Sequence, residues 1–176
     1  GSVSWTFYIN AMWLSPIDVS RGADTVLAGN HVTFFHIFGM LGSLLAPFLL
    51  RGAGQRLVPV LIPFVGVVGA IGLVFYPQPL LLLWLALLGL TSGASLSISL
   101  TFIALRSPST EAAGAVSGMS QSFGYLMAGA GPVLFGWFHG LSGDWALPLL
   151  VLFVGAAVQF IAGVALLRGR LALSAH

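Results

Sequence analysis

The sequence of 176 residues has no cysteine and no lysine, and only 6% of its residues are charged. The absence of cysteine excludes disulfides, thiol catalysis and cysteine-ligated metal sites. The scarcity of charge excludes a soluble domain, because 58% of the residues are hydrophobic and a soluble fold of this size could not hide so much apolar surface. We therefore expect an integral membrane protein.

The six basic residues are all arginines, and they lie beside apolar runs instead of within them. In a soluble chain a pI of 9.7 would favour nucleic-acid binding. Here the arginines flank membrane spans and indicate how those spans are oriented. We expect membrane lipid as a partner and no nucleic acid.

Long apolar runs are what the sequence has in abundance. About 20 helical residues cross the hydrocarbon layer of a membrane, and continuously apolar runs favour helices over alternating strands. Six runs are separated by segments rich in Gly, Pro, Ser and charge, at residues 3–17, 27–50, 57–76, 80–105, 112–138 and 146–167. The sequence thus predicts an all-α, polytopic membrane protein with six transmembrane helices.

An internal repeat relates the two halves of the chain. The second and fifth runs share one pattern at the same spacing: His36, Phe38, Gly39, Leu41, Pro47 and Leu49 against Gln121, Phe123, Gly124, Leu126, Pro132 and Leu134. The third and sixth runs share Pro, Phe, Val and Gly in the same manner. We expect one bundle of two three-helix repeats, about residues 1–78 and 79–176, which is a plan typical of secondary transporters.

Loop charges predict that the two repeats are inverted. One set of connections and the C-terminal tail carry mainly arginine: Arg51, Arg56, Arg106, Arg168 and Arg170 against Glu111. The opposite connections are mainly acidic, with Asp18, Arg21, Asp24 and Asp144. By the positive-inside rule both chain ends lie in the cytoplasm, and the membrane is expected to be the plasma (inner) membrane. Because each repeat has an odd number of spans, its two copies run in opposite directions.

Polar residues in the middle of spans are candidates for a solute pathway. His36 and Gln121 occupy matching positions of the repeat, and ionisable groups at that depth are commonly functional. Any proton coupling within this chain would have to involve His36. The alternative is a structural His that donates to a backbone carbonyl of a neighbouring helix. Asn10 is also in mid-span, and we expect it to bond to another helix or to a ligand.

Catalytic and metal-binding patterns are missing from the sequence. No nucleophile lies at a suitable spacing from a base, and His31 and His36 are on different faces of one predicted helix. We therefore expect no enzyme activity, no cofactor and no metal site.

The most specific sequence patterns lie in the fifth run, with SGMSQSFGY at 117–125 and GPVLFG at 131–136. Further matching patterns are FY at 7–8, WL at 13–14 and GSLL at 42–45, followed by Pro47. In these patterns the chain resembles the C-terminal six-helix half of a major facilitator superfamily transporter, most closely the cyanate and 2-nitroimidazole permease-like branch. The resemblance covers essentially the whole chain.

The resemblance implies where a solute would bind. In that family the first and fourth spans of each half line the cavity, and the second and fifth spans flank it. The implied cavity residues are therefore Tyr8, Asn10, Trp13, Ser92 and Ser95, with His36, Gln121 and Tyr125 beside them. His36 and Asn10 depart from the usual residues of the family, so cyanate itself is not carried over as the solute.

The expected function is secondary active transport of a small solute, with an organic or inorganic anion as one candidate. Alternating access needs two six-helix bundles, so we expect a partner, either a missing N-terminal half of the same polypeptide or a second copy of this chain. One alternative is a non-transporting membrane subunit or scaffold whose polar stripes only pack helices. A channel is disfavoured, because no ring of charge and no filter-like loop is visible.

Overall fold

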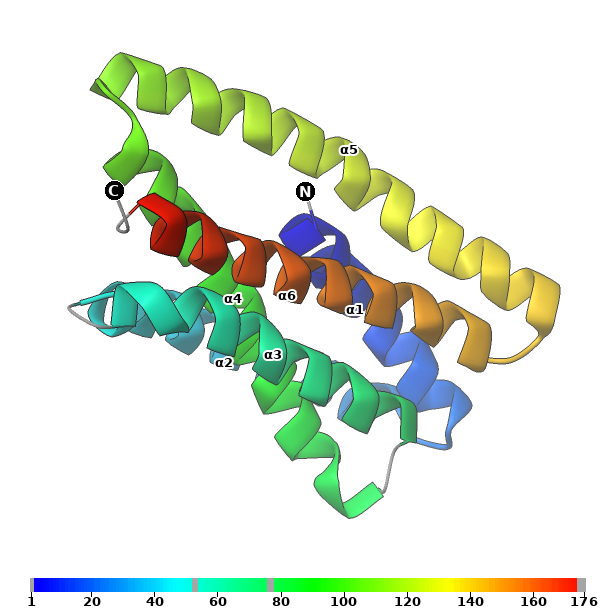
Figure 1. Cartoon of the computed structure of the whole chain (residues 1–176). Helices are drawn as coiled ribbons and strands as arrows, with labels where there is room; N and C mark the ends of the chain where they lie inside the picture. The colour runs from blue at the N-terminus through cyan, green and yellow to red at the C-terminus, as the bar shows by residue number, and fades with distance from the viewer. Residues whose placement is uncertain (1, 52–53, 76–77, 174–176) are drawn as a thin grey trace.

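A computed structural model describes residues 2–51, 54–75 and 78–173, and it confirms that the chain is helical (Figure 1). Each predicted run corresponds to one helix, and a short 3-10 turn, η1, precedes the fourth. The elements are α1 Ser2–Ser20, α2 Thr25–Leu49, α3 Gly54–Phe75, η1 Gln78–Leu80, α4 Leu81–Arg106, α5 Thr110–Ser142 and α6 Ala146–Leu173. Tyr76, where the third predicted run ends, lies outside the described residues.

The fifth helix extends beyond its predicted bounds at both ends, and its caps explain why. Ser109 is the N-cap, and its hydroxyl accepts a hydrogen bond from the backbone N–H of Ala112 at 3.1 Å. At the other end Gly143 adopts a left-handed conformation with φ of 70°, which glycine tolerates and which stops the helix. The polar residues outside the apolar run therefore belong to the helix, and α5 has 33 residues.

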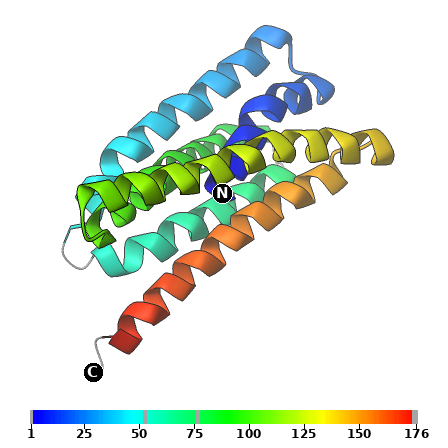
Figure 2. The same ribbon diagram turned by 90° about the horizontal axis from the view of Figure 1, so that it is seen from above.

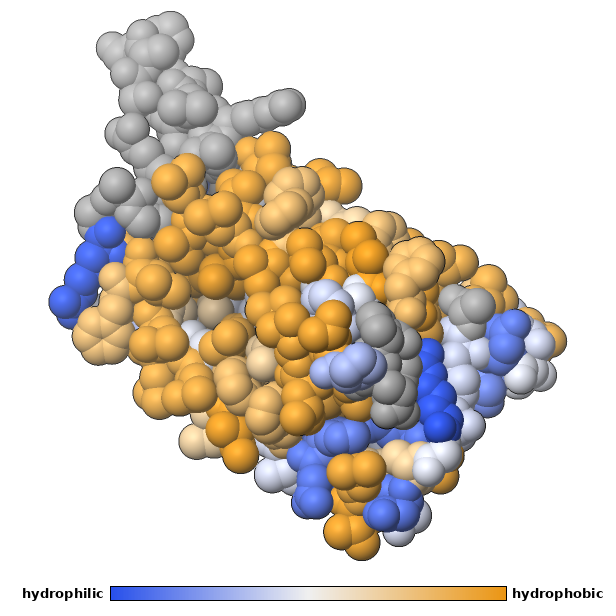
Figure 3. Space-filling model, turned by 90° about the horizontal axis from the view of Figure 1, so that it is seen from below, coloured by the Kyte–Doolittle hydropathy of each residue, from blue (hydrophilic) through white to orange (hydrophobic). Residues whose placement is uncertain are grey.

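Four of the helices in the described part of the chain are long and apolar enough to cross a membrane: Thr25–Leu49, Leu57–Phe75, Leu81–Arg106 and Leu147–Ala165. The helices α1 and α5 are not among these four. Much of the apolar surface is not covered by the protein itself, as the hydrophobic face in Figure 3 shows, with hydrophilic residues toward its edges. Such a surface is suited to lipid or to another apolar partner.

The main helix contacts join helices of the first half of the chain to helices of the second half. α2 packs most extensively on α4, and α5 packs mainly on α1. α3 packs on both α4 and α6 (Figures 1 and 2). The core between these pairs is apolar and includes the fully buried side chains of Phe35, Leu85 and Phe135.

The contact between α2 and α4 is a close approach of two backbones. A Cβ atom added at Gly93 would overlap the carbonyl oxygen of Gly39, and one added at Gly42 would overlap that of Leu90. Gly89 is equally restricted by the carbonyl oxygen of Phe35. Small residues allow this approach in membranes, where no hydrophobic effect drives helices together.

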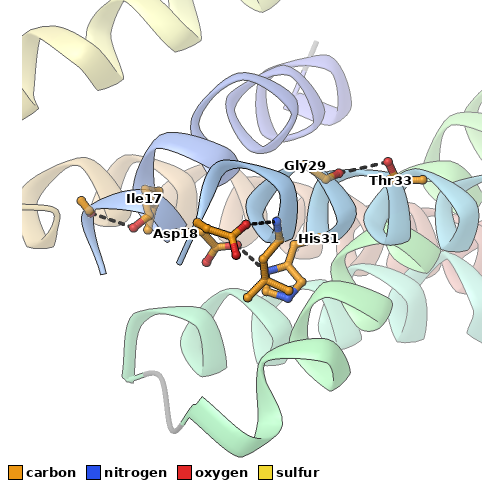
Figure 4. A network of polar contacts seen from close by, with 8 residues as sticks. Ile17, Asp18, Gly29, His31 and Thr33 are labelled. Carbon is orange, nitrogen blue, oxygen red and sulfur yellow. Dashed lines mark hydrogen bonds and ion pairs between the residues drawn. The ribbon is translucent and has the colours of Figure 1, made fainter. Parts of the chain in front are cut away.

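The ends of α1 and α2 are joined by a buried polar pair (Figure 4). An Asp18 carboxylate oxygen lies 2.6 Å from Nδ1 of His31, and their side chains are 1% and 13% exposed. This corrects the expectation that Asp18 belongs to the connection after the first span, because it lies in the last turn of α1. Its burial requires a partner, and His31 supplies one from the second turn of α2.

Replacing Gly93 with Ala is expected to destabilise the protein by about 2 kcal/mol or more, because the new methyl group would push α2 away from α4. Gly129→Ala is the matched control, since nothing lies within 4 Å of a Cβ at that mid-helix position. It should be neutral or stabilise by up to about 1 kcal/mol through helix propensity. Thermal unfolding of both variants in detergent tests the difference, and equal stabilities would contradict the close contact.

His31→Ala is expected to lower the free energy of unfolding by about 2 kcal/mol, because it removes the imidazole that lies 2.6 Å from the buried Asp18 carboxyl group. Asp18→Asn keeps an oxygen that can accept a hydrogen bond, and should cost less. Asn30→Ala, at an exposed neighbouring position of α2, should change the free energy of unfolding by less than about 0.5 kcal/mol. If His31→Ala and Asn30→Ala unfold at the same temperature, the pair does not stabilise the fold.

Candidate functional site

A cavity of about 200 Å³ opens where α1, α4 and α5 meet, and we call it the α1–α4–α5 cavity. Four residues predicted for the solute pathway line it from three helices: Tyr8, Ser92, Gln121 and Tyr125. Apolar side chains, among them Phe7 and Leu96, form most of the remaining wall. The structure therefore brings together residues that lie far apart in the sequence.

The polar groups of this cavity are uncharged and accessible. Tyr125 is 62% exposed and Tyr8 is 37% exposed, so both rings can meet a solute. The Gln121 amide nitrogen donates to the hydroxyl of Ser117 one helical turn earlier, at 3.0 Å. That bond orients the amide of Gln121 along α5. Among the described residues, no charged side chain lines this wall, which offers hydrogen-bonding groups and apolar surface.

His36 is not among the residues that line this cavity. Its ring centroid lies 5.6 Å from that of Phe7 and 5.2 Å from that of Phe35. Phe7 itself lines the cavity, so His36 is next to a residue of the wall. Its effect on a solute in this cavity would pass through the position of Phe7.

Asn10 and Ser92 line a smaller, central hollow of about 20 Å³, enough for one water-sized molecule. The Asn10 amide nitrogen donates to the backbone carbonyl of Thr6 in its own helix, at 2.8 Å. Thr6 and Gln159 also line the hollow, and the Gln159 amide nitrogen donates to the Thr6 hydroxyl at 2.6 Å. The bond from Gln159 to Thr6 joins α6 to α1, and it is a polar contact that the sequence-based site did not include.

Trp13 lies at the contact between α1 and α5. Its indole N–H donates to the backbone carbonyl of Pro132 at 3.0 Å, and its ring packs on Phe135 and Trp145. A Cβ at Gly136 would press on the same ring. These contacts hold the two helices together.

Ser95 lies apart from Ser92, although the two are three residues apart on α4. It lines another cavity of about 300 Å³, whose wall comes mainly from α3, α4 and α6, with Val3 of α1 and Ser120 of α5, and which we call the α3–α4–α6 cavity. α4 runs at an angle to α3 and α6 (Figure 1), so one polar stripe meets different neighbours along its length. Within the described residues, no group of three His, Asp or Glu side chains comes close enough together to hold a metal ion.

Comparison with known proteins finds several named transporters. The chain is 35% identical over 165 residues to the uncharacterized transporter YycB of Bacillus subtilis, covering 93% of this chain and 41% of that protein. It is 36% identical over 165 residues to the 2-nitroimidazole transporter of Escherichia coli, with 93% and 42% covered. It is 27% identical over 142 residues to the cyanate transport protein CynX of Escherichia coli, with 78% and 37% covered.

No family model and no solved structure matches this chain. The chain spans about four-tenths of the length of these three relatives. All three relatives are named for transport and none as an enzyme, which supports the sequence-based expectation of a non-enzymatic protein. The chain is thus a multi-pass membrane protein that is similar, over nearly all of its length, to part of known transporters.

Proposed function

We propose that the chain is one six-helix bundle of a secondary transporter of the major facilitator type, and that its solute binds in the α1–α4–α5 cavity. The observation that carries this proposal is the gathering of Tyr8, Ser92, Gln121 and Tyr125 around one open cavity. Solutes of alternating-access transporters bind near the middle of the membrane, where helices of both bundles meet. Uncharged polar groups beside apolar rings are suited to a small polar solute.

The pairing of the helices supports an inverted repeat. If α1 corresponds to α4 and α2 to α5, the contact of α2 with α4 has its counterpart in the contact of α5 with α1, and both contacts occur. α3 packs on α6, its own counterpart. We extend this to six membrane spans with both ends in the cytoplasm, in the plasma (inner) membrane, as the arginine-rich connections indicate.

A second bundle is required for transport by rocking of two halves. The relatives are more than twice as long as the region they share with this chain, which supports a second bundle in the same polypeptide. A second copy of this chain would serve the same purpose. In either case the second bundle closes the exposed side of the cavity.

The solute that we propose is small, and the names of the relatives suggest nitroimidazoles and cyanate-like anions as first probes. The described residues that line the α1–α4–α5 cavity carry no charge. A positive charge that balances an anion would therefore come from the second bundle or from helix ends. His36, next to Phe7, sets the shape of the cavity in this scheme.

Gln121→Ala and Tyr125→Phe are each expected to lower the initial rate of solute uptake about five- to tenfold, because each removes one hydrogen-bonding group from the cavity. Uptake of radiolabelled 2-nitroimidazole and cyanate into vesicles that contain the full-length protein measures the effect.

Ser122→Ala is the matched control, because the Ser122 hydroxyl donates to Gly118 of its own helix and lies outside the cavity wall. Its uptake should equal that of the wild type. Equal uptake by the Gln121 and Ser122 variants would place the solute elsewhere. Absence of uptake of either probe by every version would favour the non-transporting subunit, in which the polar residues only pack helices.

A further inference from the structure

We propose that the central hollow holds one bound water molecule, and that this water links Asn10 to the solute site through Ser92. The hollow has a volume of about 20 Å³, which is room for a single water. Ser92 lines both the hollow and the α1–α4–α5 cavity, whereas Asn10 lines only the hollow. Asn10 is then a positioning residue that acts on the solute without touching it, an inference that rests on the proposed function.

The lining of the hollow is suited to water. It comes from α1, α3, α4 and α6, and its polar members are Thr6, Asn10, Thr91, Ser92 and Gln159. All of these except Gln159 are more than nine-tenths buried. Empty cavities in proteins are apolar, whereas a buried hollow with several polar groups around it holds water.

Two of these polar groups lack a partner that a water would supply. The Asn10 amide nitrogen donates to the Thr6 carbonyl at 2.8 Å, and the amide oxygen accepts no hydrogen bond from a described residue. The hydroxyl of Thr91 donates to the Leu87 carbonyl, but the structure shows no such bond for Ser92 in the described part of the chain. Buried polar groups are nearly always hydrogen-bonded, and one water can bridge both.

The charge of the lining favours water over an ion. None of the described residues around the hollow is charged. A cation there would lose its hydration without gaining a counter-charge. A neutral molecule that both donates and accepts hydrogen bonds fits the amide oxygen and the hydroxyl equally well.

The bridge transmits the effect of Asn10 to the solute. A serine hydroxyl has one donor position and two acceptor positions, so a water on Ser92 leaves positions free for a solute in the α1–α4–α5 cavity. Because the water restrains the rotation of the hydroxyl, less freedom is lost when the solute binds. Asn10 should therefore affect the affinity for the solute and not the rate at which the bundles rock.

Hydroxyl-radical footprinting of the purified full-length protein tests for the water itself, because radicals formed from a buried water oxidise the side chains beside it. Leu88 and Leu152 line the hollow and are only 5% and 2% exposed. Both should be oxidised in the wild type. Leu85, which is buried outside the wall of the hollow, should not be. Equal oxidation of the three leucines would overturn the water site.

Two variants remove the water by different routes. Asn10→Leu keeps the size of the side chain and makes it apolar, and Gly66→Ala adds a methyl group to the wall, where only the Thr91 side chain lies within 4 Å of it. Both should lose the oxidation of Leu88 and Leu152. Both should also raise KM for solute uptake about five- to tenfold with little change in the maximal rate. Asn30→Leu, at an exposed position of α2, is the matched control and should change neither.

Each measurement can contradict the proposal. Oxidation that persists in both variants would overturn the water site, and an unchanged KM in variants that have lost the oxidation would overturn the role of Asn10. A lower maximal rate at an unchanged KM would show a purely structural role for Asn10. The footprint uses no solute, so it decides the water site even if the uptake experiment contradicts the proposed function.

Discussion

Where α2 crosses α4, Gly39 and Gly42 face Gly89 and Gly93, and the two backbones are in direct contact. The packing of the remaining helices depends on this contact, because it fixes α4, which also packs on α3 and contributes to both cavities. Close backbone packing replaces the hydrophobic effect, which does not operate between helices in lipid. The glycines therefore define the fold, and the other faces of α4 are left for polar residues.

Those other faces of α4 give the bundle two different polar environments. Ser92 faces α1 and α5, in an open cavity with exposed Tyr and Gln side chains, whereas Ser95 lies on the side of α3 and α6 and has a buried hydroxyl without a partner among the described residues. No described residue of either wall is charged, which suits helices that must remain stable in a membrane. The pair of Asp18 with His31 lies instead near the ends of α1 and α2.

The sequence predicted the helices well, because long apolar runs and capping residues act locally. Of the eight residues predicted for a solute pathway, four line one cavity, Tyr8, Ser92, Gln121 and Tyr125, whereas His36, Asn10, Trp13 and Ser95 do not line it. The sequence could not separate Ser95 from Ser92, since a helical stripe shows which residues share a face and not which neighbour that face meets. The pairing of Asp18 with His31 was missed for a similar reason. Asp18 was assigned to the connection after the first run, and the sequence does not show which residue of the next helix it meets.

The contact of α2 with α4 also constrains how the protein is made. Membrane helices emerge from the ribosome in order, and the partner of α2 is the helix that follows α3. Until α4 is inserted, the glycine face of α2 has no partner, and α1 must wait longer still for α5. The main contacts of the first two helices therefore form only when helices of the second repeat have been made.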